Sequence, residues 1–194
     1  MQLPSFYKQL KLKSEALNFN MPSDVLLGSL LKTLVTSKTK GHFLELGTGT
    51  GLSLSWMIAG MDDSSTIISL DNEEKFLKVA REHFEKDQRV SIHCADGAKW
   101  ITNYSGSSFD LIFADTWPGK YSHLEETLAL VKPGGFYVVD DLKPQENWPE
   151  GHDKKVEKLI DNLASCDDFN LTQLDWSTGI IVMSKKALAE KQKE

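Results

Sequence analysis

The stretch that decides the fold is Phe43-Leu44-Glu45-Leu46-Gly47-Thr48-Gly49-Thr50-Gly51, an apolar run that leads into three glycines at every second position. The apolar run predicts a buried β-strand over 42–46, and the glycines permit backbone angles and close approaches that a Cβ would block. A helix predicted over 52–60 would turn its unpaired first N–H groups toward an anionic ligand. The same glycines also suit an ordinary strand–helix turn, so this loop alone leaves the function open.

Strands and helices alternate on both sides of this stretch. We expect further strands at 66–70, 90–94, 109–114 and 136–139, and helices at 73–85, 97–103, 122–131 and 153–164. Two last strands, 169–174 and 179–183, are joined by a link too short for a parallel crossover, so they should form an antiparallel hairpin. The pattern predicts one α/β domain, with a seven-stranded, mostly parallel sheet that carries helices on both faces.

The ends of the chain and its composition complete the domain. The 194 residues are 40% hydrophobic and 26% charged, as in an ordinary globular domain. Helices at 5–18 and 23–36 would form an N-terminal cap (1–39) on the core (40–183), followed by a charged tail (184–194). The net charge of -6 disfavours nucleic acid as a partner. The two separate cysteines, the lack of a long apolar run and the absence of a signal-like N-terminus favour a cytoplasmic protein that contacts no membrane.

Acidic residues follow the strands at the positions where α/β sheets bind ligands. Asp71, Asp96, Asp115 and the pair Asp140-Asp141 come at the carboxyl ends of successive strands. Asp71 lies twenty residues past Gly51 and could accept hydrogen bonds from both hydroxyls of a ribose, or it could cap the helix after it. Asp96 could accept from an adenine amino group or cap the next short helix. Together with the glycine loop, these acids predict a nucleoside site.

Motif spacing separates the candidate cofactors. A dinucleotide-binding turn requires a third glycine at the position that Leu52 occupies, and the Lys-Ser/Thr ending of a phosphate loop is absent. The ordered set of motifs from Phe43 to Gly51, with Asp71, Asp96-Gly97, 109–115 and 130–135, resembles that of class I S-adenosylmethionine-dependent methyltransferases. The resemblance implies a Rossmann-like fold and S-adenosylmethionine as cofactor. It also implies the following cofactor-binding residues: Glu45, Gly47, Thr48, Gly49, Gly51, Ser53, Asp71, Asn72, Asp96, Gly97, Asp115 and Trp117.

Within that class, the segment Ala114-Asp115-Thr116-Trp117 through Tyr121 is most similar to the small-molecule O-methyltransferases of the catechol and caffeoyl-coenzyme A type. This resemblance implies O-methylation of a small-molecule hydroxyl and a divalent cation such as magnesium held by Asp115, Asp140 and Asp141. Two residues depart from the pattern. Asp141 stands where that group has Asn, and Pro118 stands where it has a catalytic lysine, although Lys120 is close in sequence.

The candidate catalytic residues are Asp115, Lys120 and His152. His123 is a second candidate base, and the alternative for either histidine is simple exposure to solvent. Trp117, Tyr121 and Trp148 could line an aromatic pocket under a lid formed by 143–151, whereas a plain surface loop is the alternative for that segment. Trp100 and Trp176 are expected to pack in the core.

Several alternatives stay open at this stage. Asp140 and Asp141 would repel each other without a cation if their side chains converged, but one of them could instead face away or cap a helix. A non-catalytic S-adenosylmethionine-binding sensor or partner subunit competes with the enzyme because the lysine is replaced by Pro118. An NAD-dependent oxidoreductase is disfavoured by Leu52. A homodimer is an alternative to a monomer.

Overall fold

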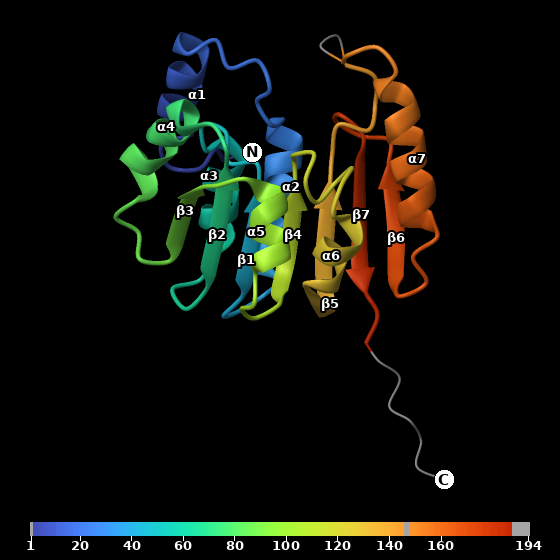
Figure 1. Cartoon of the computed structure of the whole chain (residues 1–194). Helices are drawn as coiled ribbons and strands as arrows, with labels where there is room; N and C mark the ends of the chain where they lie inside the picture. The colour runs from blue at the N-terminus through green and yellow to red at the C-terminus, as the bar shows by residue number, and fades with distance from the viewer. Residues whose placement is uncertain (1, 146–147, 188–194) are drawn as a thin grey trace.

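The computed structural model describes residues 2–145 and 148–187, which form one seven-stranded sheet in the order β3-β2-β1-β4-β5-β7-β6 (Figure 1). The strands are β1 (His42–Leu46), β2 (Thr66–Asp71), β3 (Val90–Cys94), β4 (Phe109–Ala114), β5 (Val131–Val139), β6 (Phe169–Leu174) and β7 (Ile180–Lys185). The first five strands pair in parallel, and β7 pairs antiparallel with both β5 and β6. The predicted sheet and its closing hairpin are therefore confirmed.

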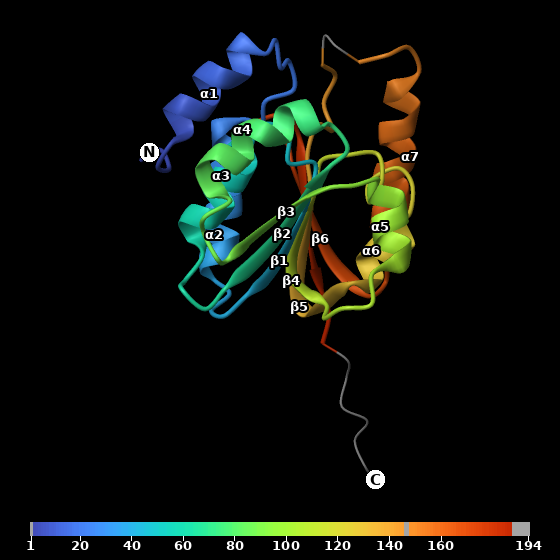
Figure 2. The same ribbon diagram turned by 60° about the vertical axis from the view of Figure 1, so that its left-hand side comes forward.

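Helices cover both faces of the sheet. They are α1 (Tyr7–Ala16), α2 (Val25–Thr36), α3 (Leu52–Gly60), α4 (Glu74–Phe84), α5 (Gly97–Asn103), α6 (Leu124–Ala129) and α7 (His152–Ala164). Figure 2 shows α2 and α3 on one face and α5, α6 and α7 on the other. A hydrophobic core therefore lies on each face of the sheet. Successive side chains of central β1 enter opposite cores, with Phe43 in one and Leu44 in the other. A parallel strand buried on both faces explains why apolar residues occupy successive positions at Phe43 and Leu44, and again at Leu46.

The direction of the connections reverses between β1 and β4, which lie side by side at the centre of the sheet. Chain connections leave this point toward opposite edges, so the loops after β1 and β4 diverge and open a crevice at the carboxyl ends of the strands. The glycine loop after β1 and Asp115 after β4 therefore lie beside each other at this end of the sheet. The backbone N–H of Asp115 donates to the carbonyl oxygen of Leu46, which fixes this register.

Some predicted boundaries were wrong. β5 begins at Val131 instead of Phe136. The turn expected before Phe136 does not interrupt the strand; instead the pairing of β5 with β4 shifts its register there, and Gly134 has a φ of 74°. The helix predicted at 122–131 is shorter, since His123 adopts a φ of 54° just before α6. β7 continues through Lys185, so the first two residues of the predicted tail pair with β6.

The two tryptophans expected to pack in the core behave differently. Trp100 stacks on Tyr104 with ring centroids 4.5 Å apart, as expected of a packing residue. Trp176 is 40% exposed in the β6–β7 turn, so it is not a core residue. Residues 146–147 of the predicted lid and 188–194 of the predicted tail lie outside the described residues. Among the described residues, no helix combines the length and apolar character needed to cross a bilayer.

Candidate active site

A cavity of about 500 Å³ opens at the carboxyl ends of the central strands. Its walls come from the glycine loop, the ends of β2, β3 and β4, the segment between α1 and α2, and the segment around the start of α7. The lining residues predicted from the sequence are Gly47, Thr48, Gly49, Ser53, Asp71, Asn72, Gly97, Asp115, Trp117, Lys120, Tyr121, Asp141, Trp148 and His152. One hollow thus gathers most of the predicted site.

The glycine loop can follow its path only without side chains at two positions. Gly47 has a φ of 108°, and a Cβ there would lie 2.9 Å from the carbonyl oxygen of Asp115. Gly49 has a φ of 51°, and a Cβ there would lie 2.8 Å from the Phe19 ring. The loop is therefore pressed between β4 on one side and the α1–α2 segment on the other, where bare backbone forms the cavity wall.

Asp71 serves two purposes at once. One carboxylate oxygen accepts from the backbone N–H of Gly49 at 2.8 Å, and the other accepts from that of Glu73 at 2.9 Å. The carboxylate thus ties the glycine loop to the start of α4 while it lines the cavity. Both interpretations offered by the sequence, a cavity-facing acid and a helix cap, are compatible with this geometry.

Three residues predicted to bind the cofactor lie outside the cavity lining. Glu45 is fully buried beneath the loop. Gly51 lies against α4, where a Cβ would be 2.9 Å from the Cβ of Ala80. Asp96 caps α5 by accepting from the backbone N–H of Lys99 at 2.9 Å. The cavity is instead completed by residues that the sequence did not single out, Phe19 and Phe76, whose rings meet edge to face 4.8 Å apart. The signal for Phe19 was an aromatic residue in the polar link between two predicted helices.

The predicted acidic cluster forms. One ligand oxygen each from Asp115, Asp140 and Asp141 lies within 4.8 Å of the others. Asp140 is buried, and its Oδ1 has no hydrogen-bond partner in the part of the chain that the structure describes. Burial and repulsion between the neighbouring carboxylates raise the pKa of Asp115 well above its ordinary value, and burial likewise raises the pKa of Asp140. The alternative that one of the paired acids faces away is excluded by this arrangement.

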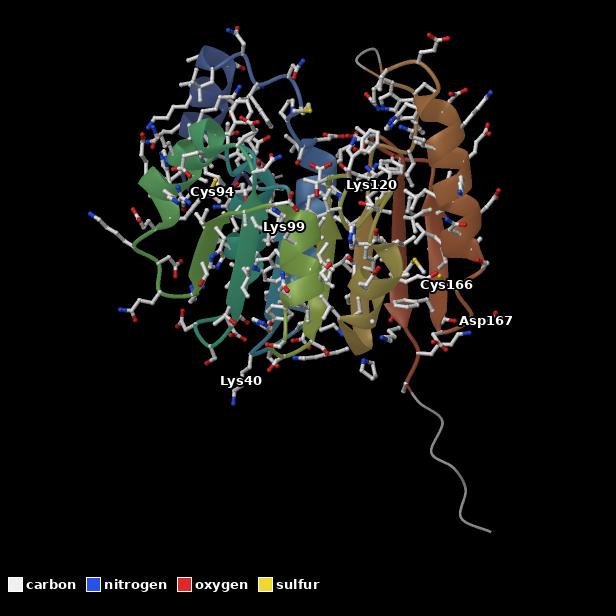
Figure 3. The ribbon with its side chains drawn as sticks, viewed as in Figure 1. Lys40, Cys94, Lys99, Lys120, Cys166 and Asp167 are labelled. Carbon is white, nitrogen blue, oxygen red and sulfur yellow. The ribbon has the colours of Figure 1, made fainter. Side chains whose placement is uncertain are left out.

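Lys120 reaches the acidic cluster from the loop after β4. Its buried Nζ donates to the backbone carbonyl oxygen of Asp140 at 2.6 Å. The ammonium charge lowers the pKa of both Asp115 and Asp140, although burial outweighs it. Figure 3 places Lys120 near the end of the sheet where the cavity opens. Three carboxylates with one buried cation leave a net negative pocket when all are ionised.

An aromatic wall faces the acids. The Tyr121 hydroxyl and His152 Nε2 are 3.2 Å apart, and the Trp148 ring lies 4.7 Å from the His152 ring. His152 is the first residue of α7, and its buried Nδ1 has no hydrogen-bond partner among the residues that the structure describes. Burial, followed by the charge of Lys120, lowers the pKa of His152, so its neutral form is favoured. His123, the other candidate base, is not among the lining residues.

Comparison with known proteins agrees with this architecture. The sequence profile of a family described as "Methyltransferase domain" matches residues 44–142, just over half of the chain. The chain belongs to this methyltransferase domain family. The matched segment runs from β1 to the residue after Asp141, so it contains the glycine loop, Asp71 and the acidic cluster.

Relatives of this family member carry related names. A protein of Mycobacterium avium (strain 104) named "Putative O-methyltransferase" is 29% identical over 118 residues, which are 58% of this chain and 53% of that protein. The match thus spans about half the length of the curated relative.

Two solved structures share the fold. The O-methyltransferase TomG of Streptomyces achromogenes, which is involved in tomaymycin synthesis and was crystallised with SAM, has a TM-score of 0.82 at 18% identity, over 96% of this chain and 92% of its own. A Staphylococcus aureus structure described as a "putative caffeoyl-CoA O-methyltransferase" has a TM-score of 0.77 at 19% identity, over 93% and 92% of the two chains.

Proposed function

We propose that this family member is an S-adenosylmethionine-dependent methyltransferase that methylates a hydroxyl group of a small molecule. The observation that carries the proposal is one cavity lined by the glycine loop, Asp71 and two members of the acidic cluster, Asp115 and Asp141, with Asp140 buried beside them. The names of the relatives and the family profile support the same activity. Methyl transfer to oxygen requires mainly that donor and acceptor be aligned with water excluded, and such positioning supplies ~7–11 kcal/mol of the barrier reduction.

The cofactor would lie along the glycine loop. Asp71 is placed to accept from ribose hydroxyls, and Gly47 and Gly49 let the backbone approach the methionine portion. Asn72, Ser53, Gly97 and Trp117 line the same hollow. We also propose that Asp96 accepts a hydrogen bond from the adenine amino group, in addition to capping α5.

The acidic cluster fits a divalent cation. Asp115, Asp140 and Asp141 offer hard oxygen ligands at converging positions, and the unpartnered Oδ1 of Asp140 is buried beside them. Magnesium bound there would lower the pKa of an acceptor hydroxyl and orient it. Asp141 would serve as a ligand in place of the asparagine of the resembling enzymes.

The chain's own residues would handle the acceptor proton. Neutral His152 has its Nε2 paired with the Tyr121 hydroxyl and can take up a proton at the cavity wall. Lys120 donates from Nζ to the Asp140 carbonyl oxygen, where it would position the acidic cluster instead of acting as a base. Tyr121 and Trp148 would pack against the acceptor, which favours a planar one.

The decisive experiment is a methyl-transfer assay with labelled S-adenosylmethionine and a panel of vicinal aromatic diols, with magnesium or with chelator. We expect turnover that requires magnesium and is lost in Asp140→Asn. Asp167→Asn is the matched control, because Asp167 lies past the far end of α7 from the cavity (Figure 3). Tight cofactor binding without turnover on any acceptor would favour a sensor. Stabilisation by NAD, but not by S-adenosylhomocysteine, would favour an oxidoreductase.

Location and assembly are further proposals. The free thiols of Cys94 and Cys166 are compatible with the reducing cytoplasm that we propose as the location. The homodimer stays a prediction that sedimentation equilibrium would test.

A further inference from the structure

A carboxyl group lies under the glycine loop, outside the proposed catalytic machinery. Glu45, in central β1, is 0% exposed. Its Oε2 accepts from the Ser69 hydroxyl at 2.5 Å, and the Ser69 and Thr48 hydroxyls are 2.6 Å apart. Thr48 belongs to the loop and lines the cavity. A buried relay of two hydroxyls therefore connects Glu45 to the cavity wall.

The relay has a defined direction. Ser69 has one hydroxyl proton and donates it to Glu45, so the bond between Ser69 and Thr48 must be donated by Thr48. Both hydroxyls thus direct their protons toward the carboxyl group. The other oxygen of Glu45, Oε1, has no partner within hydrogen-bond geometry among the described residues, although the Ser53 hydroxyl lowers the pKa of the carboxyl. Hydrogen bonds therefore compensate the charge of an ionised Glu45 only in part, and a change in that charge alters the polarisation of the two hydroxyls of the relay.

Among residues 2–145 and 148–187, no cationic side chain is placed to neutralise Glu45. On β2 the charged neighbour is Asp71, on β4 the residue paired with Glu45 is Phe113, and α3 carries no charged side chain. On α2, Lys32 lies against Gly60 at the far end of α3, and Asp24 at the helix start is engaged by the backbone N–H of Leu26 and the Ser177 hydroxyl.

The buried carboxyl consequently titrates near neutrality. Burial raises the pKa of Glu45 to about 7, with a smaller increase from Asp71, while the hydroxyls of Ser53 and Ser69 act in the opposite direction. Both charge states are thus accessible at ordinary pH, and a ligand cation next to the loop would favour the ionised one.

The methyl donor carries a positive charge on its sulfur atom, and the product of methyl transfer does not. The sulfonium of S-adenosylmethionine is positive, whereas the thioether of S-adenosylhomocysteine is neutral, and the only other difference between the two molecules is the transferred methyl group. We propose that Glu45 is a positioning residue whose ionisation beneath the loop favours the cationic methyl donor over the neutral product, so that donor binding releases a proton. This inference rests on the proposed function and adds a basis for product release.

The test is calorimetric titration of the metal-free protein with each of the two ligands at pH 6, 7 and 8. The measured quantity is the ratio of the product Kd to the donor Kd. We expect this ratio to rise several-fold from pH 6 to pH 8 in the wild-type protein and to rise much less in Glu45→Gln. Because both proteins meet the same ligands, titration of the ligand amino groups cancels in the comparison. Buffers of different ionisation enthalpy should reveal proton release on donor binding to the wild type only.

A second variant guards against misfolding of Glu45→Gln. Ser69→Ala keeps the acid but removes its hydroxyl donor, so the pH midpoint of the ratio should move upward. An identical pH dependence in wild type and Glu45→Gln, or an unmoved midpoint in Ser69→Ala, would overturn the inference while leaving the proposed function intact. Failure of the wild type to bind either ligand would instead overturn the proposed function.

Discussion

At the scale of single residues, Asp71 shows how one side chain joins structure to recognition. Its two oxygens hold the backbone of Gly49 and the start of α4, yet the carboxylate still lines the cavity. A carboxylate retains further lone pairs after two such bonds, so it can also accept from a ligand. The residue therefore shapes the loop and offers a binding group at the same point.

Replacement of Asp71 by Asn should weaken cofactor binding more than it destabilises the fold. The amide keeps one acceptor oxygen, but a hydrogen bond to a charged group is lost, and such bonds contribute ~1.5–3 kcal/mol. We expect a ~10–100-fold rise in the Kd for S-adenosylhomocysteine by calorimetry. Asp167→Asn is the control, and an unchanged Kd in Asp71→Asn would contradict the role of Asp71.

At the scale of elements, the third glycine of the loop joins two helices. Gly51 precedes α3 at a φ of 92°, and a Cβ would meet Ala80 of α4 at 2.9 Å. Gly51 thus sets the spacing between α3 and α4, whereas Gly47 and Gly49 shape the cavity wall. The regular spacing of the three glycines conceals this division of roles.

Gly51→Ala should destabilise the protein by ~2–4 kcal/mol, because it adds a left-handed backbone cost to a steric clash. Gly134→Ala is the matched control, since Gly134 has a φ of 74° with open space around its Cβ position, and it should cost only ~1–2 kcal/mol. Urea denaturation would measure both free energies of unfolding. Equal losses would show that the contact with α4 is unimportant.

The N-terminal helix is also tied to the loop. Ser14 of α1 donates to the carbonyl oxygen of Leu10 at 2.7 Å, so the 2.6 Å bond between Ser14 and Thr50 must be donated by Thr50. Both hydroxyl-bearing residues are buried. Ser14→Ala should therefore leave the Thr50 proton unpaired and cost ~1–3 kcal/mol.

A double-mutant cycle would isolate this bond between α1 and the loop. Adding Thr50→Val to Ser14→Ala removes the stranded hydroxyl, so the double variant should lose less than the sum of the single changes. Hydrogen exchange at residues 47–51 should be faster in Ser14→Ala than in the wild type. Strictly additive losses would argue against coupling between the helix and the loop.

At the scale of the whole molecule, buried acids make stability depend on pH. The pKa of Glu45 rises from 4.5 to about 7 on folding, so the folded state holds a proton that the unfolded chain has released. The stability that this proton contributes is complete below pH ~4.5 and is lost as the pH rises through about 7. Asp115 and Asp140 act in the same direction, while His42 and His152, whose pKa values are lowered by burial, act oppositely.

The difference between wild type and Glu45→Gln isolates one of these contributions. From pH 5 to pH 8, the free energy of unfolding of the wild type should fall relative to the variant by an amount on the order of 3 kcal/mol. Urea denaturation in chelator at each pH would measure it. A difference that stays constant with pH, or that grows in favour of the wild type, would contradict a raised pKa for Glu45.

The sequence by itself determined the order of strands and helices and the edge at which the site lies. Its apolar runs, glycine turns and chain-terminal hairpin are local signals, and parallel strands must end at a common edge. The acids after β2, β4 and β5 were therefore predictable as neighbours. The same reasoning from local sequence signals also predicted that Gly47, Gly49 and His152 lie at the edge of the sheet where the cavity opens.

Only the tertiary structure decided which of these side chains face the cavity. In the folded protein, Glu45 is buried beneath the loop and Asp96 caps α5. Lys120 contacts the Asp140 carbonyl oxygen, and the Phe19 ring lies against Gly49. Each outcome depends on the path of a loop or on contacts between residues far apart in the chain. Spacing along the sequence carries no record of those contacts, because they are fixed by how the helices pack against the sheet.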